Sequence, residues 1–143
     1  MKTIKFRGKD FHTGEWLYGD LRQRLGYFPS IIRHYPNDEG KVAYQEICVV
    51  EDTVGQFTGL YDKDGKEIYE GDILKLGGHG RNGVCEVKWN ESVAAFCIRF
   101  SFEQMLGLKP LGDWLETERD IVIIGNIHDT PPEKLAVKKI TND

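Results

Sequence analysis

The sequence predicts a mostly β protein, an antiparallel barrel-like or sandwich domain with one or two short helices. Short segments rich in β-branched and aromatic residues recur along the chain, and turns containing Gly, Asp, Asn and Pro separate them. Helical patterns are confined to residues 101–118 and to a short stretch after Pro132. Strands joined by turns rather than by helices favour antiparallel packing over a parallel α/β sheet.

Seven segments carry the strand pattern: residues 3–7, 15–21, 30–35, 42–50, 83–90, 94–102 and 121–127. In residues 83–90 (GVCEVKWN), Cys85, Val87 and Trp89 alternate with polar residues and therefore share one face. Residues 42–50 predict a strand with a bulge. In residues 101–118, Phe102 and Met105 have helical spacing, a Gly- and Pro-containing break follows, and a further turn is expected around Trp114.

A chain of 143 residues predicts one domain, spanning residues 1–130 and divisible into an N-terminal unit (1–55) and a C-terminal unit (56–130). Residues 131–143 are expected to form a short helix and a loose tail. Two stretches are alike, GEWLYGDL (14–21) and KEIYEGDI (66–73). They indicate either a tandem duplication or a chance recurrence of a β-rich corner, and we favour the second interpretation.

The overall charge and the cysteines bound the function classes. A formal net charge of −4 disfavours general phosphate binding over the whole surface, although it leaves room for a local basic patch. Three cysteines without a C-x-x-C pair are typical of buried, unpaired thiols in a reducing cytoplasm. No signal-peptide pattern and no apolar run of membrane-spanning length occurs, so we expect a cytoplasmic protein without a membrane partner.

Residues 56–76 (QFTGLYDKDGKEIYEGDILKL) are dense in Asp, Gly and Glu and invite a calcium interpretation. An EF-hand loop needs acidic ligands at fixed positions. With Gly65 as the sixth position, the first would be Leu60; with Asp62 as the first, the twelfth would be Ile73. Both registers fail, and we predict a hairpin instead, with Lys63 and Asp64 at the centre of a type I turn and Gly65 in a G1 bulge.

Residues 54–76 (VGQFTGLYDKDGKEIYEGDILKL) resemble the central motif of the YopX family, which occurs in phages and prophages of bacteria. Residues 5–21 resemble the N-terminal segment of that family, and residues 121–135 (IVIIGNIHDTPPEKL) resemble its closing segment. The family usually has Tyr where this chain has His128, and Asn-Pro near Thr130. The resemblance implies a mostly β domain from a phage-related element, and it transfers no activity and no catalytic residue.

Other motifs suggest a cofactor or a metal, but the residues around them do not match what such a site requires. The G-x-G-x-x-G of residues 78–83 precedes a strand rather than the helix that a dinucleotide site requires, so it predicts a hairpin loop. The four histidines are scattered without partners at zinc-ligand spacing, and no nucleophile–base pair is apparent. We therefore expect no cofactor, no metal and no catalytic residue, and a small enzyme is the third hypothesis.

Residues 21–35 (LRQRLGYFPSIIRHY) interleave arginines with aromatic residues. Such a pattern suits single-stranded nucleic acid, through phosphate pairing and base stacking. It equally suits core aromatics flanked by solvated arginines that protect a sheet edge. The candidate binding residues, for nucleic acid or for a protein partner, are Arg22, Arg24, Tyr27, Phe28, Arg33, Tyr35 and Arg81.

The sequence thus favours a non-enzymatic accessory or protein-interaction module of phage or prophage origin. Its expected partner is a host or phage protein, and self-association into a homo-oligomer through β edges is also expected. The main alternative is a small nucleic-acid-binding β-barrel protein.

Overall fold

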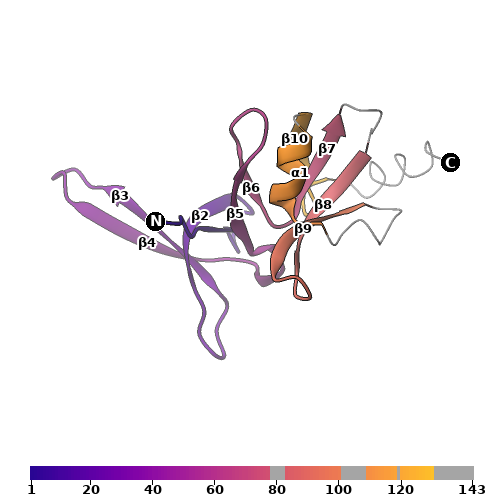
Figure 1. The fold of residues 1–143 in the computed structure, drawn as a ribbon. Coiled ribbons are helices and arrows are strands. Elements are labelled where there is room, and N and C mark those ends of the chain that lie inside the picture. Colours follow the sequence, from indigo (N-terminus) through magenta and orange to yellow (C-terminus); the bar gives the residue numbers. More distant parts are fainter. Residues whose placement is uncertain (78–82, 101–108, 119, 131–143) are drawn as a thin grey trace. The chain divides into compact units, whose positions relative to one another are not determined.

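The computed structural model describes residues 1–77, 83–100, 109–118 and 120–130, and Figure 1 shows their path. Strands dominate these residues, the strand pairs are antiparallel, and one short α-helix is present among them. The predicted mostly β fold class is therefore confirmed. The chain divides into two compact units, Met1–Phe57 (unit 1) and Thr58–Asp143 (unit 2).

Unit 1 is a sheet with the strand order β4-β3-β2-β1-β5, of which β5 continues into unit 2. Its elements are β1 (Phe6–Lys9), β2 (Trp16–Arg22), β3 (Ser30–Pro36), β4 (Val42–Cys48), the 3₁₀ turn η1 (Glu51–Thr53) and the first residues of β5 (Gly55–Tyr61). A small core forms around Leu17, Ile31 and Val49. A Cβ at Gly8 would lie 3.0 Å from the Val49 side chain, so the absence of a side chain at Gly8 is what lets Val49 pack there.

Strands β3 and β4 extend past the rest of the unit 1 sheet as a two-stranded ribbon, which Figure 1 shows in purple. Strand β2 pairs with β3 only between Ser30 and Ile32. From Arg33 to Pro36, β3 pairs with β4 alone. Side chains on both faces of this segment are consequently exposed or only half-buried. We call residues 33–45 the ribbon.

Unit 2 contains a four-stranded antiparallel sheet in the order β10-β7-β8-β9. Its elements are the end of β5, β6 (Glu67–Tyr69), β7 (Asp72–Gly77), β8 (Gly83–Asn90), β9 (Ala95–Phe100), α1 (Leu111–Thr117) and β10 (Asp120–Asn126). Leu74, Cys85 and Ile121 lie in its buried core. Helix α1 supplies Leu111 and Trp114 to that core.

Several predicted boundaries were wrong. Strand β1 begins at Phe6 rather than at residue 3. Strand β4 ends at Cys48 and pairs with β3 without a bulge. Beyond it the chain pairs with the end of β1 instead: the Val50 N–H donates to the Lys9 carbonyl at 2.9 Å, next to the Asp10–Val49 bridge. The predicted helical stretch around Phe102 and the segment after Pro132 lie outside the described residues.

The two similar Gly-Asp stretches take different structures. Gly19 lies inside β2, where its Cα faces the Phe6 position of β1. Gly71 lies in the turn between β6 and β7 with a φ of +87°. A strand interior and a left-handed turn are different backbone states, which supports chance recurrence over duplication.

The acidic centre of the chain forms the predicted hairpin turn. The Gly65 N–H donates to the Asp62 carbonyl at 3.0 Å, and Gly65 has a φ of +81°. One carboxylate oxygen of Asp62 accepts the N–H groups of Asp64 and Lys66, both at 2.9 Å. The other oxygen accepts the N–H of Ile123 in β10 at 3.1 Å. Asp62 therefore closes its own turn and holds a strand 61 residues away.

Burial of the Asp62 carboxyl opposes its ionisation. The N–H groups of Ile123, Lys66 and Asp64, helped by the Lys66 charge, outweigh this effect and lower the Asp62 pKa. A depressed carboxyl pKa stabilises the fold at neutral pH, and that stabilisation is lost as the pH falls through the folded-state pKa, below about 4.

We expect Asp62→Ala to lower the free energy of unfolding by about 1–3 kcal/mol, because buried N–H groups lose their acceptor. Asn37→Ala removes a similar turn acceptor from an exposed hairpin and is the matched control, with an expected cost below about 1 kcal/mol. Urea unfolding followed by Trp fluorescence measures both, since Trp16 lies in unit 1 with Asn37, and Trp89 and Trp114 lie in unit 2 with Asp62.

The pH dependence gives a second readout of the same contact. The stability difference between the parent and Asp62→Asn should shrink as the pH is lowered through about 4, because only the parent loses a charge there. Equal costs for Asp62→Ala and Asn37→Ala, or a difference independent of pH, would contradict this role of Asp62.

Candidate interaction surface

Exposed apolar side chains of unit 1 gather at the loop between β2 and β3. Leu25 is fully exposed, and Tyr27 and Phe28 retain 68% and 60% of their accessible surface. Phe11, from the turn after β1, lies with its ring centroid 5.0 Å from that of Phe28. We call Phe11, Leu25, Tyr27 and Phe28 the aromatic loop.

The backbone explains why these side chains stay exposed. The Tyr27 N–H donates to the Arg24 carbonyl at 3.1 Å, and Gly26 has a φ of +81°, which together make a tight turn. A turn of this kind directs consecutive side chains outward and offers them no sheet to pack on. Next to it, the Pro29 carbonyl accepts the Val49 N–H at 2.9 Å and fixes the loop to the unit 1 core.

A surface hollow of about 350 Å³ lies beside this loop. The Arg24 guanidinium lies 4.6 Å from the centroid of the Tyr27 ring, a cation–π arrangement. Gln23, Arg24, Leu25, Tyr27, Pro29 and Glu51 line the hollow. It therefore combines one aromatic and one aliphatic side chain with one cation and one carboxylate, and Tyr and Arg are enriched at protein interfaces.

The structure separates the predicted arginines. Arg22, at the end of β2, donates from Nη1 to Glu46 Oε1 at 2.8 Å, so a carboxylate neutralises its charge. Arg33 donates from Nε and Nη2 to Gln45 Oε1 at 3.1 and 2.9 Å. Arg22 faces Ser30 in the strand register, and Ser30 and Arg33 are an odd number of residues apart, so the two arginines lie on opposite faces of the sheet.

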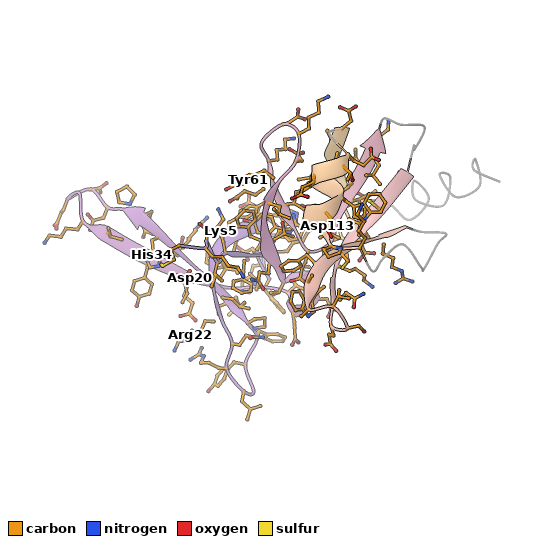
Figure 2. All side chains as sticks on the ribbon, in the orientation of Figure 1. Lys5, Asp20, Arg22, His34, Tyr61 and Asp113 are labelled. Carbon is orange, nitrogen blue, oxygen red and sulfur yellow. The ribbon has the colours of Figure 1, made fainter. Side chains whose placement is uncertain are left out.

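The remaining predicted binding residues are also divided between two places, the aromatic loop and the ribbon. Arg24, Tyr27 and Phe28 share the aromatic loop, whereas Tyr35 lies on the ribbon, on the face of Arg33 and opposite Ala43. Figure 2 marks this separation, with Arg22 toward the aromatic loop and His34 out on the ribbon. Arg81 lies outside the described residues. The predicted site is therefore two surfaces of unit 1 rather than one.

Sequence reasoning missed four exposed apolar residues of these surfaces: Phe11, Leu25, Val42 and Tyr44. Phe11 joins the loop only through a contact in space, which no local pattern reveals. Leu25 left a usable signal, because a large aliphatic residue beside Gly26 in a turn has little chance of burial.

The described residues contain no group of His, Cys, Asp and Glu that could hold a metal ion. Within the described part of the chain, every helix is too short or too polar to cross a membrane.

The cysteines differ from the prediction that all are buried, because Cys48 is exposed. Burial raises the pKa of the Cys85 thiol to about 12 and also raises that of Cys97. Both therefore remain protonated and unreactive at neutral pH. The prediction was wrong for Cys48 because the last residue of β4 turns its side chain away from the small core of unit 1.

We expect a thiol reagent to modify Cys48 in the native protein and to reach Cys85 and Cys97 only after unfolding. Mass spectrometry of the labelled protein, with and without urea, measures this. Cys48→Ser is the control and should leave the native protein unlabelled. Labelling of Cys85 at the rate of Cys48 would contradict the buried placement.

The fold and the surface together define a mostly β protein of two units, with four exposed apolar side chains at the aromatic loop of unit 1. The YopX protein family matches residues 5–135, and the chain belongs to that family. A crystal structure of the protein EF1440 from Enterococcus faecalis is similar in fold, with a TM-score of 0.50 and 21% identity. The similarity covers 94% of this chain and 99% of that one. No curated protein matches the chain.

Proposed function

We propose that this YopX-family chain is a non-enzymatic interaction module that binds a protein partner through the aromatic loop. The observation that carries the proposal is the cluster of Phe11, Leu25, Tyr27 and Phe28, all exposed and drawn from two turns of one unit. Contiguous exposed apolar surface is unfavourable in water and commonly marks a docking site. Aromatic residues beside an arginine are also the side chains that most often dominate binding energy.

The family supports the wider setting of this proposal. From the YopX resemblance we infer an accessory factor of phage or prophage origin that acts in the cytoplasm and whose partner is a host or phage protein. The proposal assigns no reaction to the chain.

Native affinity capture followed by mass spectrometry tests the proposal. The double variant Leu25→Ser/Phe28→Ser removes two exposed side chains and should weaken binding of the captured partner about tenfold or more. Val93→Ser/Ile124→Ser removes two exposed apolar side chains of unit 2 and is the matched control, for which binding should not change. A purified partner that binds the loop variant as tightly as the parent would overturn the proposal.

Single-stranded nucleic acid is the second candidate, favoured by Arg24 over Tyr27 with Phe28 adjacent. The charges argue against it. Unit 1 carries eight Lys or Arg and eight Asp or Glu residues, and Arg22 is already paired with Glu46. Strong binding needs several free cations along one groove.

We therefore expect no mobility shift of a single-stranded DNA or RNA oligonucleotide at low salt. Arg24→Ala tests the loop, and Arg33→Ala, on the ribbon, is the matched control. A salt-sensitive shift that Arg24→Ala abolishes and Arg33→Ala preserves would establish the nucleic-acid alternative instead.

A further inference from the structure

The hydrogen-bonding direction of β4 follows from bonds at its two ends. Before the strand, the Lys41 carbonyl accepts the Asn37 N–H at 2.8 Å; after it, the Val49 N–H donates to the Pro29 carbonyl at 2.9 Å. Both bonds point toward β3 and both β4-side residues have odd numbers. Because backbone direction alternates along an antiparallel strand, the even-numbered residues of β4 point away from β3.

The outward residues are Val42, Tyr44 and Glu46, each with one N–H and one C=O. Among the described residues, β4 pairs with β3 alone over this stretch. The next outward carbonyl, that of Cys48, accepts the Phe11 N–H at 3.0 Å, so the open edge ends there. The structure therefore leaves a three-residue ladder available for another strand.

The other sheet edges among the described residues are covered or short. On β10, the Ile121 carbonyl accepts the Lys63 N–H, and the Ile123 N–H donates to Asp62. Strand β9 is bridged to Pro110 at Cys97. Strand β6 has only three residues. The β4 edge differs from all of these.

The β4 edge also lacks the devices that keep strand edges apart. Strand β4 (VAYQEIC) contains no Lys and no Pro. Its single charge, on Glu46, is neutralised by Arg22 at 2.8 Å. Val42 and Tyr44 retain 78% and 67% of their accessible surface, and both lie on the same face of the ribbon.

We propose that the outer edge of β4 binds the same edge of a second copy, forming an antiparallel β4–β4 pair across a two-fold axis. In the register that uses only the open groups, Tyr44 lies on the axis and faces the partner's Tyr44. Val42 then faces the partner's Glu46. Each of these pairs exchanges both backbone hydrogen bonds, so every outward group finds an acceptor or donor.

A second copy fits this edge better than an unrelated strand because the edge is self-complementary in that register. No charge meets a like charge: Glu46 faces Val42, and Gln45 faces Ala43 on the opposite face. The Tyr44 and Val42 side chains of both copies then form one apolar strip on the joined sheet. A register centred on Gln45 would need the Cys48 carbonyl, which Phe11 already occupies.

Charge swapping at Tyr44 tests the pairing and its register with the full chain. Analytical ultracentrifugation of the parent should show a concentration-dependent dimer. Tyr44→Lys and Tyr44→Glu should each weaken dimerisation well over tenfold, because two like charges meet on the axis. An equimolar mixture of the two variants should dimerise again. Tyr35→Lys, at an exposed tyrosine of β3, is the matched control and should dimerise like the parent.

Hydrogen exchange supplies an independent readout. The amides of Val42, Tyr44 and Glu46 should exchange more slowly in concentrated than in dilute parent protein, and far-UV circular dichroism should show that all variants are folded. A parent chain that stays monomeric up to about 1 mM would overturn the proposal. So would a Tyr44→Lys variant that dimerises like the parent, a mixture that stays monomeric, or a dimer lost in Leu25→Ser/Phe28→Ser.

Discussion

The fold depends on one repeated interaction, in which a side-chain oxygen of Asp or Asn accepts the backbone N–H groups of its own turn. Asp62 and Asn37 begin hairpin turns of the same form. In each, the side-chain oxygen accepts the N–H groups two and four residues later, and a glycine three residues later has a positive φ, at Gly65 and Gly40. A short polar side chain and a glycine therefore suffice to reverse the chain between strands.

The stretches that carry the family resemblance contain these turns. Asp10 accepts the N–H groups of His12 and Thr13, and Asn126 accepts those of His128 and Asp129. Asp10, Asp62 and Asn126 thus place one such turn in each of the N-terminal, central and closing segments that resemble the family, and all three lie within the matched residues 5–135. Such residues specify the backbone and leave the binding surface unspecified. Membership of the family therefore bears on the fold of this chain, and the turns that carry the match assign it no activity.

Turn chemistry was predictable from the sequence because it is local. The spacing of Asp and Gly alone was enough to predict which of residues 62–65 occupy which position of the turn. The end of β4 was not predictable, since Val49 leaves the strand to bridge Asp10 and fill the small core of unit 1. The prediction of a single binding surface was wrong for a similar reason, because it depends on which face of the sheet each side chain occupies. Residues 21–35 looked like one basic and aromatic surface, but strand alternation places Arg22 and Arg33 on opposite faces.

The geometry of the β4 edge also bears on solubility. An open strand edge whose single charge is neutralised favours strand addition, and head-to-tail addition continues without limit wherever a second open edge is available. A two-fold pair is closed, because each copy consumes the open edge of the other and leaves none behind. The ribbon itself gains from this closure, since two strands alone are only marginally stable in water and four are not. Limited self-pairing would therefore order the ribbon and end growth at the same step.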